Sequence, residues 1–492
     1  MINKKRVFYL LIIFAIFLLG LYFRFNAYLF ARPLWGDECY LFSNIYMLNY
    51  LELFRGLNHY QSAPPIFLVI TKFIISHFGV KELSLRFFPF LVSIIAIPVF
   101  YKFSKIFLEK KWSIIAANLL FAINTQLIYY AEEYKQYSTD VLVIMLLFIF
   151  LNKIKVKNLT TKTIWLYILV TMICPLISLP SYFIIAGWFL KELFSNKNKS
   201  DIIKLFGINL PLLIVTVLYY IFTLSVQRHN IFDVSTIIWE HGFLSFNLQN
   251  NFKVITEIFK YIFYPCDFVT MQILLFITGI VLFIKTYEKD YSKHLLLILA
   301  ATIICSAAQL YPMYQRVSLY LTPIFIIVLT KCLDYLSVNK KFYSIPALII
   351  FSLAFWNYNF SHFIESKNCT YWFYRNTNAR ILMKNMAASY KPQDTVFVYA
   401  PAREEYKYYK LYYNFKPTKE ILLPTYKFYK GDYYAMLQDK IKTTDSCWFF
   451  FASDWSFDSR GAKTLKRMIK ENKFKRITKY ETGISYLLYV EK

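Results

Sequence analysis

Long runs of apolar residues constrain this chain more than any other feature of its sequence. The first run follows the cationic start Lys4-Lys5-Arg6 and continues to about Phe30. A helix of about 20 apolar residues spans the hydrocarbon core of a bilayer, and this run is too long for a signal-peptide core. Because 57% of the 492 residues are hydrophobic, the sequence predicts an integral membrane protein with a retained first helix.

The positive charge of the chain has a distribution that indicates membrane orientation. The formal net charge is +26, and the lysines gather in short clusters between apolar runs, as in Lys102–Lys111 and Lys285–Lys293. Such clusters mark cytoplasmic loops by the positive-inside rule. The charge therefore argues for a multi-pass protein with a cytoplasmic N-terminus and against a nucleic-acid-binding protein.

One short apolar run decides the predicted topology. Residues Ile66–Phe78 are too few to span and include Lys72 and His77, so we expect an interfacial or re-entrant helix on the outer side. With this run excluded, every lysine-rich loop falls inside, the C-terminus falls outside, and the spans number about eleven. The expected spans lie near residues 7–30, 85–101, 113–130, 140–151, 205–224, 317–333 and 342–360, with a hairpin turning at Ser178–Ser181 and two helices between residues 270 and 311.

The pattern changes near Ser361, which predicts a second domain. Strands are expected at Asp394–Tyr399, Cys447–Ala452 and Gly483–Val490, and amphipathic helices at Thr377–Tyr390, Arg403–Tyr413 and Lys463–Asn472. Strands alternating with helices favour a small α/β domain. We therefore expect a membrane core at 1–360, with outer-face loops 31–84, 131–139 and 225–270, and an extracytoplasmic α/β domain at 361–492. The spacing leaves a Cys369–Cys447 disulfide open.

The first outer loop carries adjacent carboxylates. Asp37 and Glu38 stand beside Trp35 and Tyr40 at the expected membrane surface. Carboxylates are costly near lipid, and an aspartate beside an apolar wall can accept a proton from an attacking hydroxyl. The alternative interpretation is an ordinary loop acid or a helix N-cap.

Further ionisable residues lie on the same expected face. The second outer loop contributes Glu132, Glu133, Lys135 and Asp140, and each has a structural alternative, such as Asp140 favouring the start of a helix. His59, in the first loop, is a phosphate ligand, a proton relay or merely interfacial. Arg316 precedes a late span among aromatic residues, where it suits either a lipid phosphate or snorkelling to headgroups.

Four short motifs occur in an order that resembles GT-C glycosyltransferases. They are Trp35-Gly-Asp-Glu, Ser62-Ala-Pro-Pro, Arg86-Phe-Phe-Pro and Tyr130-Ala-Glu-Glu-Tyr-Lys-Gln-Tyr137. The sequence is most similar to the bacterial group of aminoarabinose transferases and protein O-mannosyltransferase-like proteins. The motifs cover the first third of the chain, and the remainder resembles the group by helix pattern and an outer C-terminal domain.

This resemblance implies a fold, a donor and a set of roles. The fold would be a GT-C membrane core, and the donor a polyprenyl-phosphate-linked sugar. The resemblance places the catalytic base on Asp37 with Glu38 beside it, and a second acidic site on Glu133 or Asp140, with Glu132 adjacent. It places phosphate binding on Arg316 and Lys135.

Two positions depart from the aminoarabinose transferases. Ser62-Ala63 stands where they have a lysine before proline, and Tyr40 stands where they have an arginine. We therefore expect a different arrangement around the donor phosphate, and aminoarabinose is not implied as the sugar. The chain has no Asp-x-Asp motif and no glycine-rich phosphate loop, which argues against a nucleotide-sugar donor.

The predicted activity is transfer of a hexosyl or pentosyl unit to an acceptor hydroxyl outside the cytoplasmic membrane, with inversion. The acceptor would be an envelope lipid, glycan or protein, and no nucleic acid is expected as a partner. No motif requires a cofactor, and a divalent metal is left open. The rival interpretations are a polyprenyl-linked glycan flippase or transporter, a non-catalytic assembly protein and a polysaccharide polymerase or ligase. The clustering of acids at outer helix ends, rather than at mid-membrane, favours the transferase.

Overall fold

The computed structural model divides the chain into two compact units. It describes residues 4–226, 242–264, 268–339, 378–425, 429–442, 444–451, 475–482 and 485–491, together with residues 464, 467, 468, 470 and 471. The helical unit comprises Met1–Phe30, Tyr50–Thr71 and Arg86–Ser361, and the α/β unit comprises Ala31–Asn49, Lys72–Leu85 and His362–Lys492. The predicted helix at 342–360 and Cys369 lie outside the described residues, as does most of the helix expected at Lys463–Asn472.

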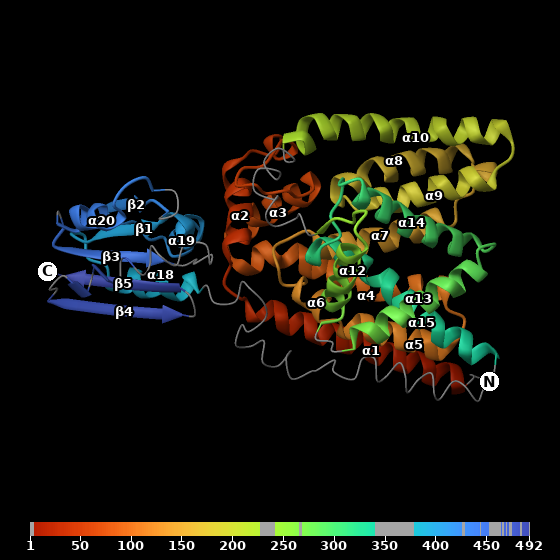
Figure 1. The fold of residues 1–492 in the computed structure, drawn as a ribbon, viewed down its shortest axis with the longest axis horizontal. Helices are drawn as coiled ribbons and strands as arrows, with labels where there is room; N and C mark the ends of the chain where they lie inside the picture. Colours follow the sequence, from red (N-terminus) through yellow and green to blue (C-terminus); the bar gives the residue numbers. More distant parts are fainter. Residues whose placement is uncertain are drawn as a thin grey trace. The chain divides into compact units, whose positions relative to one another are not determined.

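The helical unit is a bundle of apolar helices (Figure 1). Its elements are α1 (Lys4–Phe30), α4 (Glu82–Phe107, from Arg86 onward), α5 (Lys111–Ile123), α6 (Thr125–Tyr129), α7 (Tyr137–Leu151), α8 (Thr161–Ile177), α9 (Ser181–Ser195), α10 (Lys199–Tyr219), α12 (Leu248–Ile262), α13 (Val269–Lys285), α14 (Asp290–Ala307) and α15 (Thr322–Asn339). Short 3-10 turns lie at Glu52–Phe54, Val156–Asn158 and Gln315–Leu321 (η5), and α10 continues as a π-helix over Tyr220–Leu224. The expected hairpin is present, because α8 ends just before Ser178 and α9 begins at Ser181.

The apolar helices confirm a polytopic helical membrane protein. Within the described residues, five helical stretches are long and apolar enough to cross a bilayer: Lys4–Phe30, Glu82–Phe107, Lys199–Leu224, Asp290–Ala307 and Gln315–Tyr335. Five shorter apolar helices accompany them, at Pro65–Phe78, Lys111–Ile123, Tyr137–Leu151, Thr161–Ile177 and Val269–Lys285. The total of about eleven spans and their orientation stay predictions.

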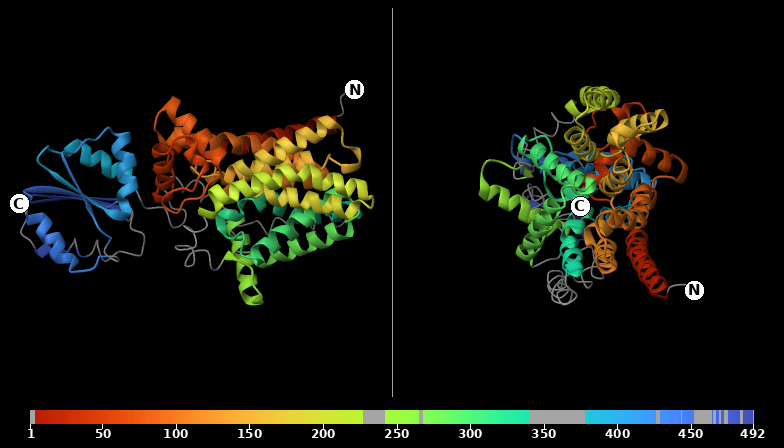
Figure 2. Two further views of the ribbon diagram at one scale, coloured as in Figure 1. Left: turned by 90° about the horizontal axis from the view of Figure 1, so that it is seen from above. Right: turned by 90° about the vertical axis from the view of Figure 1, so that its right-hand side faces the viewer.

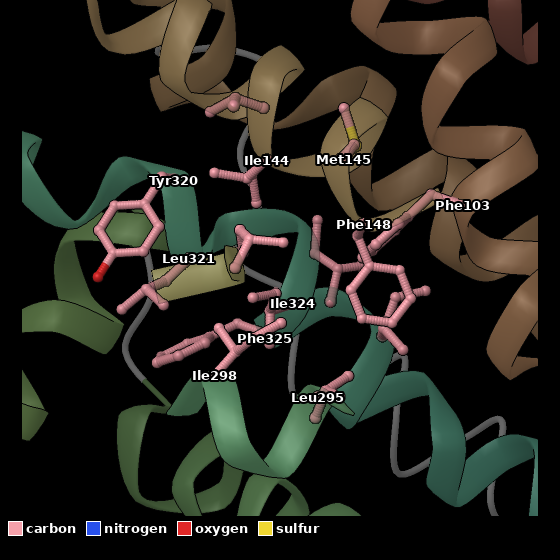
Figure 3. Packing of buried hydrophobic residues seen from close by; sticks show 14 of the residues in the cluster. Phe103, Ile144, Met145, Phe148, Leu295, Ile298, Tyr320, Leu321, Ile324 and Phe325 are labelled. Carbon is pink, nitrogen blue, oxygen red and sulfur yellow. The ribbon is translucent and has the colours of Figure 1, made fainter. Parts of the chain in front are cut away.

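Close packing between helices organises the core of the helical unit. Figure 3 shows buried side chains of α7, α14, η5 and α15 gathered in one cluster. The Phe148 ring of α7 stacks on His294 of α14 at 4.5 Å between ring centroids. Association inside a bilayer depends on van der Waals contact, so small residues let the helices approach. A Cβ at Gly279 of α13 would lie 2.1 Å from the Val328 carbonyl oxygen of α15. No larger residue fits at that position without movement of a helix.

The α/β unit contains a sheet with helices on both faces (Figure 2). Its described elements are α18 (Ala379–Ser389), β1 (Thr395–Tyr399), α19 (Arg403–Tyr412), β2 (Lys419–Leu423), α20 (Tyr433–Lys442), β3 (Ser446–Phe451), β4 (Arg476–Thr482) and β5 (Ser485–Glu491). The strand order is β2-β1-β3-β5-β4, with β2, β1 and β3 parallel and the other pairings antiparallel. The expected strands of this domain correspond to β1, β3 and β5.

Side-chain alternation along the strands explains the two helical layers. Phe397 and Phe449 are register partners on neighbouring strands, and they stack at 4.9 Å and pack in one cluster with Leu437 of α20. Phe450, one position further along β3, points to the opposite face and contacts Tyr406 of α19 at 5.3 Å between ring centroids. The period of two along a strand thus buries both faces of the sheet.

The α/β unit also includes segments from the beginning of the chain. One contains α2 (Gly36–Met47), and the other contains the end of α3 (Pro65–Phe78) and the first turn of α4. The prediction for residues 31–84 was a loop with an interfacial helix at 66–78. The structure has α3 at that place and adds α2, which packs on α19.

Candidate functional site

The acidic pair of the first loop lies in the first turn of α2. Trp35 is extended and caps the helix, and the Glu38 carboxylate accepts a hydrogen bond of 3.4 Å from the Trp35 N–H. Carboxylates in a first helical turn are stabilised by the positive end of the helix dipole. Arg32 lies 3.8 Å from Glu38, which is fully buried. Glu38 therefore supports the local structure through two contacts.

Asp37 occupies a different environment from its neighbour. Its side chain is half-buried, whereas Glu38 is completely covered. Burial raises the pKa of the nearby Tyr40 phenol, and the carboxylates of Glu405, Glu404 and Asp37 raise it further. Negative groups from α2 and α19 thus gather around Tyr40, and Asp37 is the more exposed carboxylate of the pair.

A buried cation lies in the turn between α6 and α7. The Lys135 ammonium donates a hydrogen bond of 2.7 Å to the Gln61 side-chain oxygen, and Lys135 is 4% exposed. Glu132 and Glu133 are buried in the same turn, and the Lys135 backbone N–H donates to the Glu133 carbonyl at 2.7 Å. A buried ammonium needs hydrogen-bond acceptors or an anion nearby. The turn therefore presents a fixed cation together with two carboxylates.

Arg316 of η5 joins an aromatic group in the helical unit. Its guanidinium lies 6.0 Å from the centre of the Tyr137 ring. The hydroxyls of Tyr130 and Tyr261 are hydrogen-bonded to each other. Burial raises the pKa of Tyr261 well above its usual value, Glu133 raises it further and Arg316 opposes that rise. Glu133 and Arg316 thus share Tyr130 and Tyr261 as electrostatic neighbours.

Asp140 and His59 are connected to these groups through intermediate residues. Asp140 is buried in the first turn of α7 beside Ser178, and it interacts electrostatically with Tyr311 and Tyr320. His59 is exposed and has a left-handed backbone with φ 60°. Its carbonyl accepts a hydrogen bond of 3.4 Å from the Gln61 amide. The described contacts therefore connect the His59 backbone, through Gln61, to Lys135.

Several residues of these groups were not found by sequence reasoning. Gln61 directly precedes the Ser62-Ala-Pro-Pro motif but carries no charge that would draw attention to it. Tyr261 is on α12, inside the long loop 225–270, and its amphipathic pattern was a detectable signal. Glu404 and Glu405 come from the α/β unit, more than 360 positions from Asp37. Across the described segments, no group of three or more His, Cys, Asp or Glu side chains could hold a metal ion.

Comparisons with known proteins confirm the predicted fold. No family model matches the sequence, and no curated protein matches it. Among solved structures, the chain is similar to ArnT from Cupriavidus metallidurans bound to undecaprenyl phosphate, with TM-score 0.53, 8% identity, and coverage of 100% of this chain and 98% of that one. It is also similar to the Archaeoglobus fulgidus oligosaccharyltransferase in complex with Zn and sulfate, with TM-score 0.53, 12% identity and coverage of 89% and 68%. Both are GT-C fold glycosyltransferases, and this likeness shows that the chain has the GT-C fold.

Proposed function

We propose that this GT-C-fold protein is a membrane glycosyltransferase. It moves a hexosyl or pentosyl unit from a polyprenyl-phosphate-linked donor to an acceptor hydroxyl outside the cytoplasmic membrane. The observation that carries the proposal is a half-buried Asp37 in the first turn of α2, within a chain that has this fold. The donor class is supported by the undecaprenyl phosphate bound to the Cupriavidus ArnT.

In this proposal Asp37 acts as the general base. Its carboxylate takes the proton from the acceptor hydroxyl while the hydroxyl oxygen forms a bond to the anomeric carbon of the sugar. The bond between the anomeric carbon and the phosphate oxygen breaks at the same time, and the polyprenyl phosphate leaves with the electron pair. One displacement of this kind inverts the anomeric carbon. The half-exposure of Asp37 supports this role, since Glu38 is covered by its contacts with Trp35 and Arg32.

The donor phosphate is assigned to cations of the helical unit. Lys135 supplies a buried ammonium held by Gln61, and Arg316 supplies a guanidinium that can bind two phosphate oxygens together. Their positive charge stabilises the negative charge that develops on the leaving phosphate. Glu133 orients this group through the neighbours that it shares with Arg316. His59 contributes mainly through the backbone carbonyl that accepts from Gln61.

The test is turnover of defined donors by the purified full-length protein. A panel of short-chain polyprenyl-phosphate sugars is offered with a hydroxyl acceptor, and released or transferred sugar is measured by mass spectrometry. Turnover by the wild type and its loss in Asp37→Asn, with donor binding retained, would support the activity and the base. Equal turnover in both proteins would keep the transferase and reject Asp37 as its base.

A further inference from the structure

Three side chains of the α/β unit hold the backbone that leads into the acidic helix α2. The Arg380 guanidinium donates to the Ala31 carbonyl at 2.8 Å and lies 3.5 Å from a Glu82 carboxylate oxygen. The Tyr409 hydroxyl donates to that same Glu82 oxygen at 3.2 Å, and it accepts the Leu34 N–H at 2.8 Å. The clamp formed by Glu82, Arg380 and Tyr409 therefore binds both ends of the Ala31-to-Leu34 backbone.

The clamped backbone has an unfavourable conformation at its first residue. Ala31 has φ 47°, a left-handed value that costs a non-glycine residue free energy. Such a conformation persists only where the surrounding contacts determine it, and residues of this kind are enriched at functional sites. Arg380 binds the carbonyl of this same residue. The clamp therefore fixes the angle at which the chain leaves Ala31 and enters α2.

Packing along α2 extends this fixation beyond the clamp. The Phe42 ring of α2 meets the Tyr408 ring of α19 edge to face at 4.9 Å, and both residues are buried. Near the far end of α2, the Lys72 ammonium donates to the Ile45 carbonyl at 2.7 Å. The helix that bears Asp37 is thus held at its start, along its length and near its end by residues of the same unit.

We infer that Glu82, Arg380 and Tyr409 are positioning residues for Asp37, and that the C-terminal α/β unit is thereby part of the catalytic apparatus. This inference rests on the proposed function. Tyr409 and Arg380 fix the four residues Ala31 to Leu34 ahead of α2, so they set the direction of the Asp37 carboxylate in its first turn. A carboxylate displaced by about 1 Å can lose roughly a hundredfold in rate while the donor still binds.

The experiment compares Tyr409→Phe with Tyr406→Phe in the full-length protein. Each variant removes one hydroxyl from α19, but Tyr406 donates to Glu420 at 2.9 Å rather than to the clamp. Hydrogen exchange of the peptide that contains Leu34 reports the clamp itself, with or without turnover. Steady-state kinetics with the active donor report kcat and KM separately. Arg380→Gln, alone and combined with Ala31→Gly, provides a second test, since glycine adopts φ 47° without a Cβ penalty.

The inference expects faster exchange at Leu34 in Tyr409→Phe, by roughly tenfold for the loss of one hydrogen bond. It expects kcat to fall roughly ten- to a hundredfold with the donor KM unchanged, and Tyr406→Phe to match the wild type. It expects Ala31→Gly to restore part of the kcat lost in Arg380→Gln.

Unchanged exchange at Leu34 would overturn the clamp, whatever the activity. Faster exchange with an unchanged kcat would show that the clamp does not position Asp37. A wild type that turns over no donor would instead reject the proposed function, together with the catalytic role that rests on it.

Discussion

The Lys135 ammonium lies 2.7 Å from the Gln61 side-chain oxygen, so residues 74 positions apart hold one buried cation in place. Lys135→Met keeps the bulk of the side chain and removes its charge. A charge-assisted hydrogen bond contributes about 1.5–3 kcal/mol, so the donor KM should rise roughly ten- to a hundredfold. Gln61→Ala should raise KM less, because the cation remains. Lys253→Met, which changes an exposed lysine of α12, is the control, and an unchanged KM in Lys135→Met would exclude Lys135 from phosphate binding.

The two carboxylates assigned to a second acidic site should behave differently. Glu133 shares neighbours with Arg316, so Glu133→Gln should lower turnover by about tenfold through misplacement of the cation. Among the described residues, no cation pairs with the buried Asp140, and a carboxyl group buried without a cation is costly to ionise. Asp140→Asn should therefore keep turnover and leave the thermal unfolding temperature equal or higher. Loss of turnover in Asp140→Asn, with Glu133→Gln active, would reverse the assignment.

Because α13 and α15 pack closely, we expect one added methyl group at Gly279 to lower the stability of the protein strongly. Gly279→Ala places a Cβ against the Val328 carbonyl oxygen, which forces the helices apart and should cost about 1–3 kcal/mol. The measurement is the unfolding temperature in detergent, followed by size-exclusion chromatography after heating. Gly207→Ala in α10 is the matched control, because nothing lies within 4 Å of the added atom. Equal unfolding temperatures for the two variants would contradict the packing described.

Because the Tyr409 hydroxyl is buried, we expect the stability of the folded protein to fall at alkaline pH. Burial raises its pKa well above the ordinary value, and the nearby Glu82 carboxylate raises it further. A folded-state pKa that is raised favours the folded protein below the unfolded pKa of about 10, and this contribution is lost as pH rises above it. Stability should therefore fall with pH above about 10, with a contribution from this one group of up to about 1.4 kcal/mol per pH unit.

Tyr409→Phe removes that titrating group. The fall in unfolding temperature between about pH 10 and pH 11 should therefore be smaller in Tyr409→Phe than in the wild type, which retains the Tyr409 phenol. Identical pH profiles for the wild type and Tyr409→Phe would show that the phenol does not stay protonated in the folded state.

The sequence was sufficient to predict most of the helices and the strands of the buried sheet. Apolar runs indicated the apolar helices and the hairpin at Ser178–Ser181. A helix in lipid needs apolar side chains regardless of which other helix packs against it. The strands β1, β3 and β5 are apolar and buried, which made them visible. By contrast, β2 and β4 lie at the edges of the sheet and contain charged residues, so their pattern resembled that of surface loops.

The sequence drew attention to the candidate residues but not to the contacts that hold them. Asp37 and Lys135 stood out because charges beside long apolar runs are costly and therefore informative. The clamp did not, since Glu82 lies 327 positions from Tyr409 and nothing local indicates that they meet. The helix α2 was missed for the same reason: it is stabilised by packing on α19, which a single sequence does not reveal.

Turnover of a polyprenyl-phosphate sugar by the wild type, Asp37→Asn and Glu38→Gln tests the central claim most directly. We expect sugar transfer by the wild type and loss of transfer in Asp37→Asn with donor binding intact. We expect that Glu38→Gln keeps measurable transfer but unfolds at a lower temperature, because Glu38 supports the start of α2. Full transfer by Asp37→Asn would contradict the assignment of the base, and the absence of donor binding and turnover in the wild type would contradict the transferase itself.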